Sequence, residues 1–176
     1  MQETKDSPLD RASDALDPEP SIKSVKLTAK QQKSLAAIMA KRGGEIEAGM
    51  EKIGKRIEKD VEGLTAKILK KNDTELQAIK KLPADQQDAK IEALVKKSMG
   101  EMLPPVILPY KKDVSTLFRT TMTNIFADVA PLMTPGQKPL LAAARTKYFA
   151  TFDKKLESFT TLFCDDIIKE STGSAS

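Results

Sequence analysis

The chain has 176 residues, of which 40% are hydrophobic and 5% aromatic, with no Trp, no His and a net charge of +4. This length suits one domain with a mainly aliphatic core. Without His the chain lacks the commonest general base and the commonest transition-metal ligand, and its single Cys cannot complete a zinc site or an internal disulfide. We therefore expect no enzyme activity, no metal and no cofactor.

The first 24 residues differ from the rest in charge and in pattern. Residues 1–25 carry three basic and six acidic side chains, whereas residues 26–71 carry twelve basic and six acidic ones. Three prolines interrupt residues 1–24, and no apolar period is sustained there. We expect this segment to form a flexible acidic arm.

A long amphipathic helix is predicted next. From Thr28 to about Lys71 the apolar residues recur in steps of three and four, which is one stripe on a helix. At about 1.5 Å per residue such a helix is roughly 65 Å long. Because this length exceeds a compact domain of this size, we expect a bend, with Gly43-Gly44 as the hinge.

Shorter helical segments follow. We expect one beginning at Thr74 and carrying apolar residues to Leu82, and another over 84–102. The prolines at 104, 105 and 109 predict a turn at this point, because Pro cannot continue a helix.

Two further amphipathic runs, over 111–130 and from about Pro135 or Lys138 to Lys169, are predicted to pack as an antiparallel hairpin because their connection is short. High helix propensity and the lack of β-rich runs complete the prediction. It is an all-α fold of four to five amphipathic helices, with a long bent first helix and a C-terminal antiparallel helical hairpin. The domain spans 25–170, and 171–176 form a polar tail.

Two quartets predict helix starts. In each, a Thr at the cap and a Gln three residues on can satisfy two unpaired backbone N–H groups reciprocally, and a large apolar residue comes just before. The residues are Leu27, Thr28 and Gln31 in the first copy and Met133, Thr134 and Gln137 in the second.

The pair resembles the LTxxQ motif of the Spy/CpxP family of small periplasmic chaperones and envelope-stress proteins. The likeness covers mostly 25–43 and 121–156; the two quartets lie farther apart than in that family, and Met133, Gly136 and Pro139 make the second copy imperfect. The resemblance implies an ATP-independent periplasmic chaperone that is commonly a dimer built by antiparallel pairing of long helices. It also implies an export signal in the natural precursor, with Met1 as an added start before Gln2.

A client-binding surface is predicted on the first long helix, where apolar and basic side chains alternate. Exposed apolar area rimmed by charge suits the capture of partly folded proteins, and Met adapts to partners of different shape. The candidate residues are Arg42, Met50, Lys52, Ile53, Lys55, Arg56, Ile57 and Lys59.

Two other functions remain open from sequence alone. One is a regulatory adaptor that binds a specific envelope-stress sensor or another protein partner, and the other is a helical structural module in which the quartets are a coincidence. A nucleic-acid partner is disfavoured, because no dense basic face with interleaved aromatics is present. No apolar run approaches the ~18 residues of a membrane span.

Overall fold

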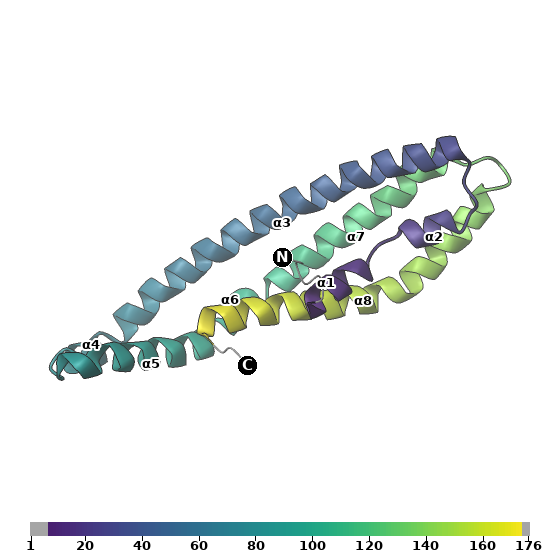
Figure 1. The fold of residues 1–176 in the computed structure, drawn as a ribbon. Coiled ribbons are helices and arrows are strands. Elements are labelled where there is room, and N and C mark those ends of the chain that lie inside the picture. Colours follow the sequence, from purple (N-terminus) through teal and green to yellow (C-terminus); the bar gives the residue numbers. More distant parts are fainter. Residues whose placement is uncertain (1–6, 174–176) are drawn as a thin grey trace, which may run out of the picture. The chain divides into compact units, whose positions relative to one another are not determined.

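The computed structural model describes residues 7–173, which are mostly helical and contain no strand (Figure 1). The predicted all-α class is therefore confirmed. In chain order the helices are α1 (Pro8–Asp14), α2 (Glu19–Lys23), α3 (Ala29–Lys71), α4 (Asp73–Ile79), α5 (Ala84–Met102), α6 (Pro104–Ile107), α7 (Tyr110–Val129), a 3-10 turn η1 (Ala130–Leu132) and α8 (Lys138–Thr172).

The predicted long first helix is α3, which spans 43 residues. It continues through Gly43 and Gly44, so the expected hinge is not a break in the helix. A Cβ added at either glycine would meet nothing within 4 Å. The helix therefore tolerates both glycines on its open side, where each costs only its intrinsic helix propensity.

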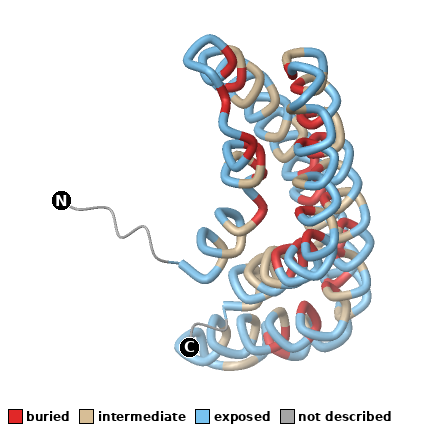
Figure 2. Tube along the Cα trace, turned by 90° about the vertical axis from the view of Figure 1, so that its right-hand side faces the viewer, coloured by how far each residue is buried: buried red, intermediate tan, exposed pale blue. Residues whose placement is uncertain are grey.

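The chain divides into two compact units, which we describe separately. Unit 1 comprises Met1–Lys52 and Lys112–Phe163, and unit 2 comprises Ile53–Lys111 and Cys164–Ser176. Both α3 and α8 contribute residues to each unit. Along these helices the buried residues form a stripe, with exposed residues opposite (Figure 2).

Aromatic side chains hold α7 and α8 together in unit 1. The ring centroids of Phe118 and Phe159 are 5.0 Å apart, and those of Phe126 and Tyr148 are 5.4 Å apart. As the residue number rises on α7, the partner's number falls on α8, so the two helices run antiparallel. The predicted C-terminal hairpin is confirmed, and its tilted ring pairs stabilise it beyond the area they bury.

The first part of α3 packs on another face of α7. A Cβ at Gly49 would lie 2.6 Å from the methyl carbons of Leu117, so the glycine permits the close approach of the two helices. Seven residues earlier, Arg42 reaches Asp128 near the other end of α7, with Nη2 and Oδ2 2.6 Å apart. These contacts make α3 and α7 antiparallel as well.

The N-terminal segment is folded from residue 7 onward, so the predicted flexible arm is wrong for 7–24. The Ser7 hydroxyl caps α1, and Leu16, Ile22 and Val25 are buried to 3% exposure or less. The Tyr148 hydroxyl also donates to the Leu16 carbonyl (2.6 Å). A few buried side chains hold these short helices in place, although the segment has no sustained apolar period. The first six residues of the predicted arm lie outside the described residues.

Unit 2 combines the second part of α3 with α4, α5, α6 and the end of α8. The Asn72 side chain donates to the Ser98 hydroxyl (3.0 Å), and the Tyr110 hydroxyl donates to Asp60 (2.6 Å). The prolines at 104 and 105 begin the short helix α6 instead of a plain turn, because Pro is tolerated in a first helical turn. Of the predicted polar tail, 171–172 belong to α8 and 174–176 lie outside the described residues.

Candidate functional site: a glutamine clasp and an adjoining groove

The first quartet caps α3 as a reciprocal box. The backbone N–H of Thr28 donates to the Gln31 side-chain oxygen (2.9 Å), and the N–H of Gln31 donates to the Thr28 hydroxyl (3.3 Å). In the second quartet the N–H of Thr134 donates to the Gln137 oxygen (3.0 Å), and α8 begins one residue later. The Gln31 oxygen thus fixes the first turn of α3, and the Gln137 oxygen fixes the turn that precedes α8.

The two quartets also meet in space. Gln31 Nε2 donates to Gln137 Oε1 (2.8 Å), and Gln137 Nε2 donates to Gln31 Oε1 (3.2 Å). Each amide nitrogen further donates to the backbone preceding the other quartet, Gln31 to the Leu132 carbonyl (2.7 Å) and Gln137 to the Lys26 carbonyl (3.3 Å). Lys26 adopts a left-handed φ of 57°. We call the quartets and these cross bonds the glutamine clasp.

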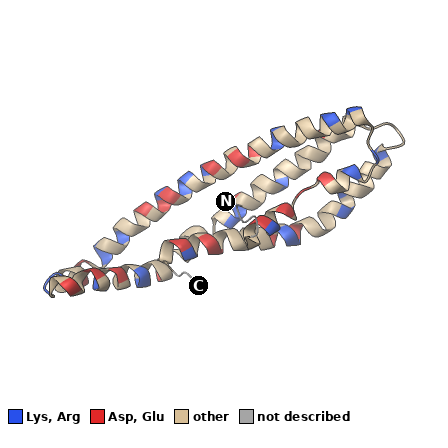
Figure 3. Cartoon of the chain, viewed as in Figure 1, with Lys and Arg blue, Asp and Glu red and all other residues tan. Residues whose placement is uncertain are grey.

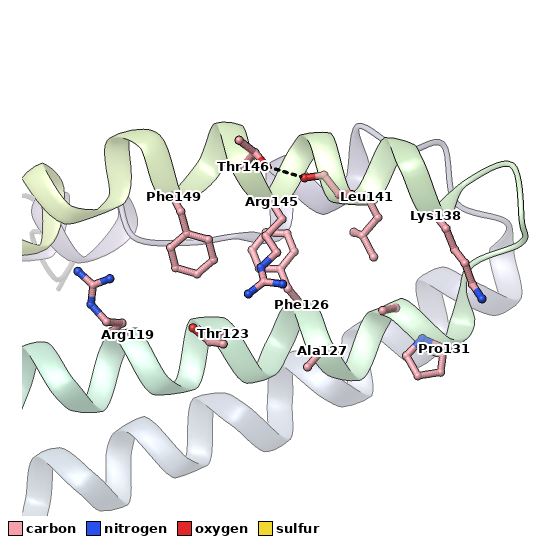
Figure 4. A pocket seen from close by; sticks show the side chains of 12 residues that line it. Arg119, Thr123, Phe126, Ala127, Pro131, Lys138, Leu141, Arg145, Thr146 and Phe149 are labelled. Atoms are coloured by element: carbon pink, nitrogen blue, oxygen red, sulfur yellow. Dashed lines mark hydrogen bonds between the residues drawn. The ribbon is translucent and has the colours of Figure 1, made fainter.

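A groove between α7 and α8, of about 1060 Å³, begins beside the clasp and lies within unit 1 (Figure 4). Two helical stripes line it, with members one, three or four positions apart on each side. From α7 and the turn after it come Arg119, Thr123, Phe126, Ala127, Ala130 and Pro131, and from α8 come Lys138, Leu141, Ala142, Arg145, Thr146 and Phe149.

The floor of this α7/α8 groove is apolar. Phe126 and Leu141 are buried within it, and Phe149 is half-buried. Ala127 and Ala142 are exposed and add little bulk. Because small side chains let another backbone come close, the floor offers both a ring surface and room for a partner element.

The rim of the groove is basic, and none of its lining residues is acidic. Arg145 lies over the ring of Phe149, with its Cζ 5.9 Å from the centroid. Arg119 forms an ion pair with Asp153 of α8, which compensates part of its charge. Lys138 stands at the clasp end (Figure 4). The groove therefore presents apolar surface framed by positive charge.

The α3 residues that we predicted to bind clients differ in exposure. Ile53 and Ile57 are each only 6% exposed, so the prediction that they face a client is wrong: they belong to the buried stripe of α3. Met50 is half-buried. What α3 exposes is a mixture of acidic and basic side chains (Figure 3).

The basic residues predicted for that surface fall into two groups. Arg42 is held by ion pairs to Glu45 and Asp128, both 2.6 Å, and these hydrogen bonds raise the pKa of its guanidinium. Arg56 lies over the Tyr110 ring, 5.1 Å from its centroid. Both therefore contribute to packing. Arg56 is nevertheless exposed, as are Lys52, Lys55 and Lys59.

The groove was missed because its signal is spread over two helices. Lys138 and Arg145 lie seven residues apart, and Arg119 belongs to a different amphipathic run. The signal that could have found it is a second stripe on each helix, rich in Ala and bearing only basic charges. The two stripes form a groove only when the hairpin places α7 and α8 side by side.

The described part of the chain was searched for metal-ligand clusters and for helices that could span a membrane. Among residues 7–173, no group of three or more Asp, Glu or Cys side chains is placed to hold a metal ion. In the same range, none of the helices combines the length and the apolar character that crossing a bilayer requires.

Comparisons with known proteins returned no match among protein-family models, curated proteins or solved structures. The likeness to the Spy/CpxP family therefore rests on the two quartets and their flanking residues, and the function has to be argued from the groove and the clasp.

Proposed function

We propose that this protein is an ATP-independent chaperone that holds partly folded clients in the α7/α8 groove. The observation that carries the proposal is the groove itself, with its apolar floor and its Lys138 and Arg145 rim. Concave apolar surface rimmed by one sign of charge suits weak capture of unfolded segments, which expose apolar side chains beside polar ones.

The clasp supports the proposal by positioning one end of the groove. Gln31 of α3 donates to the carbonyl of Leu132, in the connection between α7 and α8. Gln137 then joins the start of α8 to the residues before α3. The connection that spaces the two groove walls is thereby tied to a third helix, so the groove is largely formed before a client arrives.

The resemblance to the Spy/CpxP family supports two further parts of the proposal. It favours a periplasmic location after removal of an export signal, and a homodimer. Fractionation of the native host and the solution mass of the purified protein test these two points separately from client binding.

A regulatory adaptor is the second candidate, and one observation favours it. The groove has one defined length and a fixed set of lining residues, which suits one partner segment better than a broad apolar face would. An adaptor would show one tight interaction in a pull-down from host extract and no general protection of unfolded proteins.

The deciding experiment follows light scattering of a heat-unfolded test enzyme in the absence of nucleotide. We expect the wild-type protein to suppress aggregation at an equimolar ratio. The double variant Lys138→Glu/Arg145→Glu should lose most of this suppression, whereas Lys147→Glu, on the same helix but outside the groove, should keep it. No suppression by the wild-type protein would overturn the proposal.

A further inference from the structure

We propose that the segment held in the α7/α8 groove is a short amphipathic α-helix with acidic residues along one edge. This inference rests on the proposed function and specifies its client: a helical, acidic protein segment, in contrast to an extended or basic one. Four features of the groove lead to it.

The length of the groove matches about three helical turns. Its walls run from Arg119 on α7 to Ala130 at the start of η1, and from Lys138 to Phe149 on α8. Each stripe spans eleven residue steps, or roughly 16 Å at about 1.5 Å per residue. A client helix of about 11–12 residues covers the same distance. A hydrophobic trough between two antiparallel helices can receive the apolar face of a third helix.

The floor selects an apolar stripe. Phe149 offers a half-buried ring, and the alanines at 127, 130 and 142 leave room beside it. A client helix fills such a trough with large apolar residues at positions i, i+3 or i+4, and i+7. An extended segment would present alternate side chains to opposite sides and would leave its own backbone groups unpaired over the alanines.

The rim selects acidic residues. Lys138 and Arg145 are seven residues apart, which is two turns or about 10.5 Å along α8. Two acidic residues seven positions apart on a client helix lie on one edge at the same spacing. The lining residues include no carboxylate that would repel them. Arg119, whose charge Asp153 partly compensates, contributes less.

The volume also favours a helix over a small ligand. At about 1060 Å³ the groove stands at the upper end of the range for small-molecule pockets. It is open, and the two helices α7 and α8 lie side by side along it (Figure 4). An anionic membrane surface carries the same charge as an acidic helix, and binding to vesicles distinguishes the two.

The test uses two designed peptides of about 14 residues, long enough to span the groove. Both carry Leu at the three apolar positions; one has Glu at two sites seven apart, and the other has Lys there. Fluorescence anisotropy measures binding to the full chain. We expect the acidic peptide to bind about tenfold more tightly, and Lys138→Glu and Arg145→Glu each to weaken it about fivefold. Lys147→Glu should change its affinity less than about twofold.

Equal affinity for the two peptides, or an equal loss with Lys147→Glu, would overturn the inference. Binding to vesicles containing phosphatidylserine that depends on Arg145, without binding of the acidic peptide, would assign the groove to a membrane surface and would also overturn it. If the wild-type protein suppresses aggregation but the acidic peptide does not compete, the chaperone proposal stands and only the helical client is wrong. If the peptide binds and no aggregation is suppressed, the groove assignment stands and the chaperone proposal fails.

Discussion

The side-chain amides of Gln31 and Gln137 donate a hydrogen bond to each other in both directions, over 2.8 and 3.2 Å, although 106 positions separate them in the chain. Each of these amides also accepts from the Thr that precedes its own helix. Local capping and tertiary contact therefore share the same side chains. Removing one glutamine disturbs a helix start and the contact between two helix starts together.

The substitution Gln31→Glu separates these two roles. A carboxylate still accepts from the N–H of Thr28 and keeps the capping box, but it has no N–H for Gln137 or for the carbonyl of Leu132. Gln31 is only 9% exposed, so we expect the free energy of unfolding to fall by about 1–3 kcal/mol. Urea denaturation measures this change.

The matched control is Gln86→Glu, the same substitution at an exposed position in the first turn of α5. It should change stability by less than about 0.5 kcal/mol. If both substitutions have equally small effects, the cross bonds of the clasp do not stabilise the fold.

Two glycines of α3 are expected to respond in opposite ways to Ala. At Gly43 a Cβ meets nothing, so Gly43→Ala should raise stability by up to about 1 kcal/mol through helix propensity. At Gly49 the Cβ would lie 2.6 Å from Leu117, so Gly49→Ala forces that side chain to move and should lower stability by about 1 kcal/mol. Thermal unfolding of both variants checks the pair; a gain at Gly49 would show that α3 and α7 are not in close contact there.

Much of the fold was predictable because long amphipathic periods carry a strong signal. The run from Thr28 to Lys71 became a single helix beginning at Ala29, and the hairpin followed from two apolar runs with a short connection. Helix period and capping chemistry are local, so they can be interpreted before any tertiary contact is known.

The remaining features depend on tertiary contacts that the period does not contain. The segment holding Leu16 and Ile22 looked like an arm, because these side chains are too sparse to form a stripe, yet both are buried. Ile53 and Ile57 looked available for clients, because the period marks an apolar face without saying what covers it. The groove is formed by residues of both α7 and α8. Lys138 and Arg145 therefore belong to one site only when α8 packs beside α7, where Phe149 also lines the groove.

Tyr148 should make the free energy of unfolding decrease as the pH rises in the alkaline range. Burial, and then the carboxylate of Asp17, raise the pKa of its hydroxyl above the usual value. The folded state therefore favours the neutral phenol, and its contribution is complete below the unfolded pKa of about 10 and is lost as pH rises above it. The free energy of unfolding should fall by up to about 1.4 kcal/mol per pH unit there.

The variant Tyr148→Phe isolates this effect from the titration of lysines. It should lose about 1 kcal/mol at pH 7, because the Leu16 carbonyl loses its donor. Between pH 9 and 11, its stability should fall less steeply than that of the wild type. Equal slopes in denaturation curves would contradict a neutral, buried phenol.

Arg42 is expected to act in folding and not in client binding. Its ion pairs with Asp128 and Glu45 are partly exposed, so Arg42→Ala should lower the free energy of unfolding by about 1 kcal/mol. Suppression of aggregation, measured below the unfolding temperature, should be unchanged. The neighbouring exposed Lys41→Ala should alter neither quantity, and a selective loss of suppression with Arg42→Ala would return the client surface to α3.

The most direct measurement places a photoactivatable amino acid in the groove while the protein protects an unfolding client. At Ala142, on the groove floor, we predict client crosslinks that the acidic peptide competes away. At Lys147, on the same helix but outside the groove, we predict few or none. Equal crosslinking from both positions, or crosslinks from Lys147 alone, would contradict the claim that clients are held between α7 and α8.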